Sequence, residues 1–409
     1  MLSTLRNKVV SCSYSLLGLL VVSSTSLALA TEQSAFSQNN LQIHGFLSQG
    51  IAKSIGSDFV NDDQDASLEL TEVGINASYK ISPTLRAAGQ LVYIDGGNRY
   101  ADGARLDYLL LDWSAYQSHD WQMNVYLGRF KNYNWLYSST RDVPHTRPSI
   151  VLPQAMYFDG FRDIAVGGDG IATSIKHGNE QLGDFEFNLS FGTSEISDKQ
   201  RAIILSEFAT GDMEHDYDAQ MSIFWQPIDS QWRFGWSVLD SDFSYTAGSA
   251  DIFVDTDIIL QRFILNALYE AENWEFSSEV FQERFKLTGF YSPYFQRDTK
   301  GQGFYFQTRY QLTQDLKLLA RFERFFANKD DKSGVVQEQA TGGAIPAYFG
   351  FQHDKVLGLS YDLADNVRIQ FEHHWVEGTA RLTPVVLPNA NINDEKYWNM
   401  WALQLMYWF

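Results

Sequence analysis

The chain contains almost no cysteine. Cys12 is the single cysteine among 409 residues, so a disulfide framework is excluded. Cys12 also lies within the first 30 residues, which carry the features of an export signal. Removal of that segment would leave a mature chain without thiol chemistry.

Long apolar runs are missing as well. Beyond residue 30 no stretch of about 18 consecutive apolar residues occurs, and this is the length that marks a transmembrane helix. The mean hydropathy of −0.26 is close to that of a soluble protein. Strands that alternate between a lipid-facing and a water-facing side average to a similar value, so the hydropathy does not exclude a barrel in a membrane.

Positive charge is scarce. The chain has 31 lysine and arginine residues against 50 aspartate and glutamate residues, which gives a net charge of −19 at pH 7. Such a balance argues against a nucleic-acid role, which requires a basic face. In a pore it would favour cations, although the narrowest ring of charges decides the selectivity.

The first 30 residues are typical of a cleaved secretory signal peptide. Arg6 and Lys8 supply a positive start, an apolar stretch runs from Leu16 to Leu29, and Ala28-Leu29-Ala30 matches a cleavage site. A membrane-anchoring helix is the alternative, but serines interrupt the apolar stretch. We therefore expect residues 1–30 to be removed on export.

Aromatic residues, in contrast, are abundant at 15% of the chain. They recur at alternate positions: Trp232, Phe234 and Trp236 alternate with Arg233 and Gly235. The segments 185–191, 304–311 and 367–375 repeat the pattern. A period of two places the aromatic set on one face of a strand and the charged set on the other. The aromatic face would meet lipid, and the charged face would line a water-filled lumen.

Short polar turns and longer polar connections succeed one another along the whole chain. The short turns lie near 82–83, 118–120, 178–183, 227–230, 270–273, 313–315 and 364–366. The longer connections lie near 54–66, 96–104, 131–165, 193–214, 241–250, 287–301, 327–348 and 379–395. Together they predict an all-β fold: a transmembrane antiparallel up-and-down β-barrel of about 16 strands, with both ends on the periplasmic side. It would fill residues 31–409 as one domain. A soluble β-sandwich is the alternative.

The last strand keeps its apolar face to the final residue. Trp401, Leu403, Leu405, Tyr407 and Phe409 occupy alternate positions. This pattern resembles the C-terminal signature strand of bacterial outer-membrane barrels, which the barrel assembly machinery reads. The resemblance implies that Leu405, Tyr407 and Phe409 form an assembly signal.

A stretch in the first half of the chain resembles a family of Gram-negative outer-membrane porins. The family carries a GR-K…LY…TRD…R-S-I-LPQ…Y pattern after its fifth strand, and the matching residues here run from Gly128 to Tyr157. Residues 43–50 and 72–79 are similar to its first two strands. The resemblance implies a sixteen-stranded, trimeric pore. Its broad type is similar to the phosphate-selective porins, although no ladder of lumen arginines supports that substrate.

The longest connection, 131–165, is the candidate constriction loop, because porins fold the loop after strand five into the lumen. Opposed charges across a narrow opening screen solutes by charge and dipole. The candidate constriction residues are Arg129, Lys131, Arg141, Asp142, Arg147, Asp159, Arg162 and Asp163. A solvated extracellular loop is the alternative.

The alternation also predicts a lumen wall of mixed charge. Its candidate residues are Arg86, Asp112, Arg233, Arg262, Glu275, Glu279, Glu283, Arg309, Arg321, Glu323, Arg368 and Glu372. Glu275, Glu279 and Glu283 form an acidic stripe on one strand, without a cationic partner in that strand.

Metal sites and catalytic motifs are weakly indicated. Asn61, Asp63, Asp65 and Glu72 have the spacing of a calcium loop, but Ala66 stands where glycine is needed. No spacing of serine, histidine and acid fixes a catalytic group. We therefore predict no enzyme, no metal and no cofactor.

The expected function is an outer-membrane porin for passive diffusion of small hydrophilic solutes and ions. The expected partners are outer-membrane lipid and lipopolysaccharide, the barrel assembly machinery and two further copies of the chain. A substrate-specific channel for a sugar, an oligosaccharide or an anion such as phosphate remains the alternative. A non-conducting adhesion barrel and a barrel enzyme are more remote. Aromatic side chains of 131–165 would either stack on sugars or pack the loop against the wall.

Overall fold

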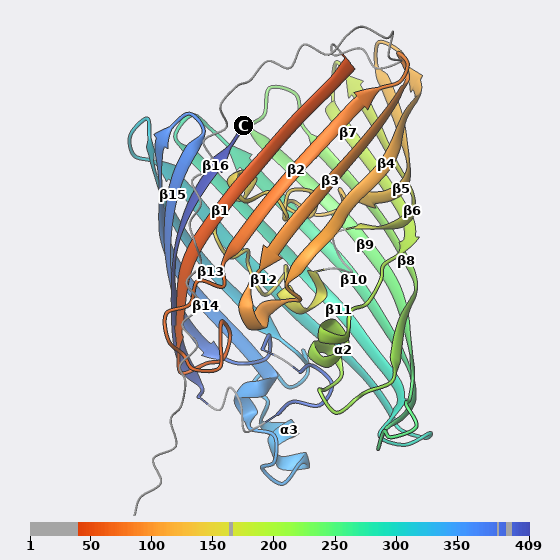
Figure 1. Cartoon of the computed structure of the whole chain (residues 1–409), viewed down its shortest axis with the longest axis vertical. Coiled ribbons are helices and arrows are strands. Elements are labelled where there is room, and N and C mark those ends of the chain that lie inside the picture. The colour runs from red at the N-terminus through yellow and green to blue at the C-terminus, as the bar shows by residue number, and fades with distance from the viewer. Residues whose placement is uncertain (1–39, 163–166, 383, 390–394) are drawn as a thin grey trace, which may run out of the picture. The chain divides into compact units, whose positions relative to one another are not determined.

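The computed structural model describes residues 40–162, 167–382, 384–389 and 395–409. These residues form a closed barrel of sixteen antiparallel strands, in which each strand pairs with its sequence neighbours and β1 pairs with β16 (Figure 1). The predicted fold class and strand number are confirmed. The predicted signal peptide, residues 1–30 with Cys12, lies outside the described residues, and so does Asp163.

The strands account for most of the described chain. They are β1 Leu41–Ile55, β2 Thr71–Lys80, β3 Leu85–Asp95, β4 Gly103–Gln117, β5 Trp121–Lys131, β6 Gly167–Asn179, β7 Gly183–Thr193, β8 Asp212–Gln226, β9 Trp232–Thr246, β10 Val254–Glu270, β11 Trp274–Phe290, β12 Gln296–Gln311, β13 Leu316–Phe326, β14 Phe351–Ala364, β15 Val367–Gly378 and β16 Tyr397–Trp408. The helices are short: η2 Gly97–Arg99, η3 Pro144–Thr146, η4 Asp159–Phe161, α2 Asp198–Ile204, α3 Val335–Ala340 and η5 Ala347–Gly350. None of the described helices has the length and apolar character needed to cross a membrane.

The two faces of the strands differ as the period of two requires. On β10, Phe263 and Leu265 face outward and are 45% and 50% exposed. Ile264 and Asn266, which alternate with them, face inward and are buried. Exposed tryptophans mark strand ends beside the short turns, among them Trp121, Trp232 and Trp274 at the starts of β5, β9 and β11. Such a belt is typical of a membrane interface, where the amphipathic indole ring is stable.

Two predicted connections are too long. β9 continues to Thr246 and so extends into the predicted connection 241–250. β11 and β12 both extend into the predicted connection 287–301, so that only residues 291–295 join them. In the second case the ladder still pairs Leu287 with Arg297. Backbone pairing continues beyond the apolar band, where polar outward side chains hide the alternation from the sequence.

The barrel closes where β1 meets β16. The backbone N–H of Gly45 donates to the carbonyl of Phe409 at 3.1 Å, and the N–H of Phe409 donates back to Gly45 at 3.0 Å. Glycine is needed at position 45, because a Cβ there would lie 2.6 Å from the Phe409 ring. The C-terminus therefore lies at the end of the barrel that carries the short turns (Figure 1).

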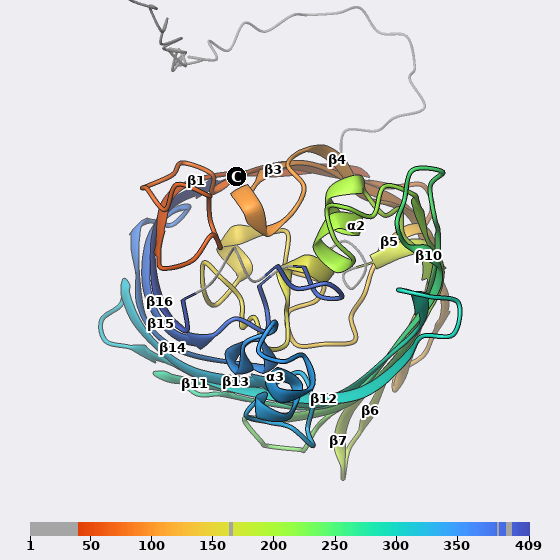
Figure 2. The ribbon, with the colours of Figure 1, turned by 90° about the horizontal axis from the view of Figure 1, so that it is seen from below.

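Long loops occupy the opposite end and fold inward. L3 denotes 132–162, L4 denotes 194–211, and L8 denotes the described part of 379–396. Figure 2 shows the yellow L3 segment inside the ring of strands. Apolar side chains of L3, L4 and L8 form one buried cluster with wall residues such as Phe281 and Tyr305. The inward position of L3 is thus stabilised by apolar burial as well as by polar contacts.

Candidate functional site

Three wall glutamates bind the backbone of L3. They project inward from β11, β13 and β15, and their carboxylates accept N–H groups from residues that would otherwise lack partners in the interior. The bonds run to Glu279 from Leu136 at 3.2 Å, to Glu323 from Ala155 at 2.7 Å, and to Glu372 from Ile150 at 2.5 Å and Val151 at 3.2 Å. L3 therefore crosses the interior and is held by three separate strands.

Wall arginines bind the same loop through its carbonyl groups. Arg262 donates to Met156 at 3.1 Å, Arg321 donates to Val151 at 2.9 Å, and Arg368 donates to His145 at 3.1 Å. Arg381 of L8 donates to the carbonyl of Ala155 at 3.1 Å. Carboxylates thus hold the donors of the loop and guanidinium groups hold its acceptors, so both kinds of backbone group are satisfied.

The charged side chains of L3 are buried and paired. Asp159 accepts from Arg99 at 2.8 Å and from Arg141 at 2.7 Å, and all three side chains are at most 5% exposed. Burial alone would raise the pKa of Asp159, but Arg99 and Arg141 outweigh it and hold the pKa below its usual value. Asp159 is therefore ionised in the interior and links L3 to η2 of the preceding loop.

A second buried group surrounds Asp142. This carboxylate accepts from Lys131 and from Arg162, and Arg162 also lies 3.4 Å from Glu72 on β2. Arg147 donates to Glu72 at 3.0 Å. The pKa of Asp142 is lowered despite its burial, because Lys131 and Arg162 are so close. These opposite charges pair with one another where L3 meets β2 and β5.

Arg129 was predicted to line the constriction, but it faces outward. Its register partner on β4 is Leu109, which is 56% exposed on the outside, and its guanidinium binds Asp169 at 2.7 Å. Gly128, with φ at +115°, does not move Arg129 off the outward face that it shares with Leu127. Lys131 alone turns inward at the end of β5, where it binds Asp107 and Asp142. Asp163 lies outside the described residues.

The twelve candidate wall residues all lie on strand positions opposite to the exposed apolar face. Six of them, Arg262, Glu279, Glu283, Arg321, Glu323 and Glu372, are buried beneath the loops. The other six form cross-strand pairs closer to the short turns. These are Arg86 with Asp112 at 2.6 Å, Arg233 with Glu186 at 3.1 Å, Arg309 with Glu275, and Arg368 with Asp362 at 2.5 Å. In the acidic stripe on β11, Glu275 and Glu283 therefore have cationic partners on neighbouring strands, Arg309 and Arg262, whereas Glu279 accepts hydrogen bonds from Tyr157 and Tyr305.

Sequence reasoning missed four charged residues that hold the loops. Glu72 was considered only for its calcium-loop spacing, yet it points inward and binds Arg147. The outward alternation of Val73 and Ile75 would have placed Glu72 on the lumen side. Arg99 and Arg381 lie in loops, where no alternation exists. Asp107 shares its parity with outward Leu109 on β4, but a register shift against β3 leaves it unpaired, and its side chain is buried. Within the part of the chain that the structure describes, no group of three or more potential metal ligands is gathered.

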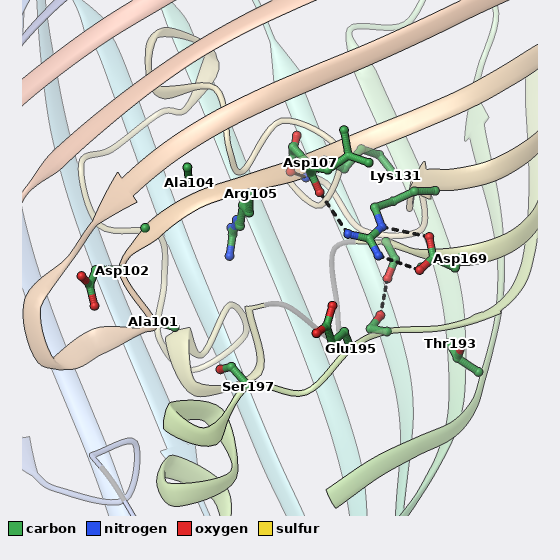
Figure 3. A pocket seen from close by; sticks show the side chains of 16 residues that line it. Ala101, Asp102, Ala104, Arg105, Asp107, Lys131, Asp169, Thr193, Glu195 and Ser197 are labelled. Atoms are coloured by element: carbon green, nitrogen blue, oxygen red, sulfur yellow. Dashed lines mark hydrogen bonds and ion pairs between the residues drawn. The ribbon is translucent and has the colours of Figure 1, made fainter.

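A polar cavity of about 350 Å³ lies beside the root of L3. Figure 3 shows Arg105, Asp107, Lys131, Asp169 and Glu195 around it, contributed by the β4, β5 and β6 strands and by L4. The pairing of β4 with β5 ends at Leu109 and Arg129, and the two strands separate from there toward the long loops. The separation opens the cavity at the loop end of the barrel.

Comparisons with known proteins agree with this architecture. No family model matches the sequence, and no curated protein matches it. The structure is similar to the anion-selective porin from Comamonas acidovorans, with 12% identity over 90% of this chain and 99% of that chain and a TM-score of 0.56. It is similar to OmpT, an outer-membrane protein of Vibrio cholerae (13% identity, 90% and 97% covered, TM-score 0.54), and to the outer-membrane channel DcaP of Acinetobacter baumannii (9% identity, 91% and 99% covered, TM-score 0.54). The chain has the sixteen-stranded barrel fold of outer-membrane porins.

Proposed function

We propose that the chain is an outer-membrane porin that lets small hydrophilic solutes and ions diffuse passively through its lumen. One observation carries the proposal: a closed barrel with an apolar outer band has an inner face of charged and polar side chains. Lipid accepts the first face and water the second, and a polar interior of this kind suits a water-filled channel. Catalysis and a bound cofactor are not part of the proposal.

The loops determine how large a solute can pass. L3 is bonded to β2, β11, β13 and β15, and L8 is bonded to both L3 and the wall, so neither loop is free to move aside. Solutes would pass beside these two loops and then along the paired charges nearer the short turns.

A trimer and recognition by the assembly machinery belong to the same proposal. A trimeric form of the Vibrio cholerae protein has been solved. In this chain Leu405, Tyr407 and Phe409 all face outward, at 49%, 42% and 57% exposure. They present a continuous apolar edge at the end of β16, which suits recognition by another protein before insertion.

The test is single-channel current across a planar lipid bilayer, with a salt gradient to read the reversal potential. Folded, heat-modifiable protein is expected to insert with conductance increments in groups of three. The sign of the reversal potential then gives the preference for cations or anions. Folded protein that inserts without conducting would overturn the channel and leave an adhesion barrel or a barrel enzyme.

A sugar channel is the second candidate, and one observation favours it. Tyr133 is 41% exposed in the interior, and its ring stacks on Tyr126 with centroids 6.0 Å apart. Trp135 and Tyr157, in contrast, are buried in the cluster that packs L3, so they offer no surface for stacking. Block of the ion current by maltotriose in the wild type, abolished in Tyr133→Ala, would support this candidate. A wild-type current that maltotriose does not change would exclude the sugar channel and leave passive diffusion as the proposed function.

A further inference from the structure

The outer surface of the barrel is hollowed over β10–β13. A groove of about 520 Å³ is lined by Phe263, Leu265, Val280 and Phe304, with Gln282 and Gln302 above them. Its floor is low at Val280, because the register places this small side chain between Leu265 on β10 and Phe304 on β12. The groove is therefore a furrow between larger side chains.

Two cations stand at the polar end of the groove. Arg324 of β13 and Lys332 of the loop after it line this end. Each is held by a ring: the Arg324 guanidinium lies 5.0 Å from the centroid of Phe322, and the Lys332 ammonium lies 5.3 Å from that of Phe326. Neither makes an ion pair with a carboxylate of the described residues. Rings position a cation without neutralising it, so both charges remain available to an anion.

The position of these cations matches the edge of the apolar band. Outward residues change from apolar to polar between Phe304 and Gln302 on β12, and between Leu357 and Lys355 on β14. On β13 the outward residue that follows Phe322 is Arg324, and it pairs with Phe304, the last apolar outward residue of β12. A cation beside the last hydrocarbon-facing residue lies within reach of lipid headgroups.

The same level on the neighbouring sector has the opposite charge. Asp240 and Asp242 of β9, Asp216 of β8 and Asp257 of β10 face outward there. In a chain with a net charge of −19, the cationic sector over β12–β14 is the exception. An anionic headgroup would be repelled by the first sector and attracted by the second.

We propose that this groove binds one anionic phospholipid of the outer leaflet, with an acyl chain along Leu265, Val280 and Phe304 and its phosphate against Arg324 and Lys332. The inference rests on the membrane location in the proposed function and adds a lipid site to it. The lipid covers a furrow that would otherwise hold loosely packed chains, and its phosphate receives two cations that have no carboxylate partner.

The test compares lipids that differ in the headgroup alone. Purified protein is refolded in detergent, and bound lipid is counted by native mass spectrometry after titration with dioleoyl phosphatidylglycerol or dioleoyl phosphatidylcholine. We expect one tightly held phosphatidylglycerol, and an affinity lower by roughly ten-fold or more in Arg324→Gln/Lys332→Gln. The matched control is Lys53→Gln/Lys396→Gln, which removes two cations already paired with Asp65 and Glu377.

A second variant separates lipid from free phosphate. Val280→Phe fills the furrow and leaves both cations in place, so it is expected to weaken the binding of phosphatidylglycerol. Inorganic phosphate is expected not to compete with the bound lipid in any variant. Equal binding of the two lipids, or equal loss in the control, would overturn the site. Protein that neither refolds to a heat-modifiable barrel nor inserts into vesicles would overturn the proposed channel as well. A conducting barrel that binds phosphatidylglycerol no better than phosphatidylcholine would overturn the lipid site alone.

Discussion

Glu372 on β15 accepts the backbone N–H of Ile150 at 2.5 Å, and 222 positions in the chain separate the two residues. The same carboxylate accepts from Val151. The position of L3 is therefore determined largely by the wall, whose side chains supply the acceptors that an irregular segment cannot supply to itself. Loop and barrel act as one mechanical unit.

Glu372→Ala tests that unit. Two buried N–H groups lose their acceptor, and each unsatisfied group costs about 1–3 kcal/mol. We expect a lower thermal unfolding midpoint together with a noisier and larger single-channel current. Glu275→Ala is the control, since Glu275 binds Arg309 and makes no bond to L3. Equal current noise in the two variants would show that Glu372 does not restrain the loop.

Lys131→Gln and Arg129→Gln form a matched pair that tests which face each side chain occupies. Both remove one positive charge at the end of β5, but only Lys131 points inward. A unit charge about 4 Å from an ion in water contributes about 1 kcal/mol, or about five-fold in permeability. Reversal potentials should therefore shift toward cations in Lys131→Gln and stay unchanged in Arg129→Gln. A shift in the second variant would contradict the outward position of Arg129.

Asp159→Asn is expected to destabilise the protein strongly, because Arg99 and Arg141 lose their shared counter-charge in the interior. Loss of one partner from a buried ion pair costs about 3–5 kcal/mol. Urea unfolding followed by the gel shift of the barrel measures it. Asp169→Asn, which breaks an exposed pair on the outer surface, should change stability by about 1 kcal/mol or less.

The acid sensitivity of the same residue has a defined sign. The pKa of Asp159 is lower in the folded chain than in the unfolded one, so its contribution to stability is complete above the unfolded pKa of about 4 and is lost below it. Wild-type protein should lose stability as the pH falls below about 4, and Asp159→Asn should lose less over that range. Parallel pH curves would contradict the ionised state of Asp159.

His145 gives a second pH dependence at higher pH. Its ring stacks on Trp408 with centroids 4.8 Å apart, and burial together with Arg368 and Arg147 lowers its pKa from 6.5 to about 4. The folded chain thus favours neutral histidine, so stability is complete above pH 6.5 and falls as the pH drops from 6.5 to about 4. His145→Gln should flatten this part of the stability curve. His119→Gln, in a short turn with its side chain 92% exposed, is the control and should leave the curve unchanged.

The alternation of side chains sufficed to predict the barrel, because lipid and water impose a period of two on every strand. It failed where that contrast ends. Lys286 pairs with Asp298 near the loop end of the ladder, yet polar outward side chains such as Arg284 and Lys286 made this part of β11 and β12 look like a loop. Strand pairing needs only backbone groups, so the ladder extends beyond the region that the lipid marks in the sequence.

The candidate site was predictable to the same extent. Parity placed Glu279, Glu323 and Glu372 on the inner face, because each is adjacent in sequence to an outward apolar residue: Val280, Phe322 and Phe371. Their binding partners in L3 were beyond reach, since those bonds join residues 122 to 222 positions apart. The outward position of Arg129 depended on whether Gly128 interrupts the strand, which the sequence leaves open.

The junction of β1 with β16 has a consequence for how the barrel forms. Every other strand pair joins sequence neighbours and is able to zip up as a local hairpin, whereas this pair joins the two ends of the described chain. Until it forms, the growing sheet has two free edges, each a template for pairing with another molecule. Closure requires the whole ladder between β1 and β16, from Phe46–Trp408 to Ile55–Asn399. The time that this one junction takes to form therefore determines how long a newly made chain stays vulnerable to aggregation.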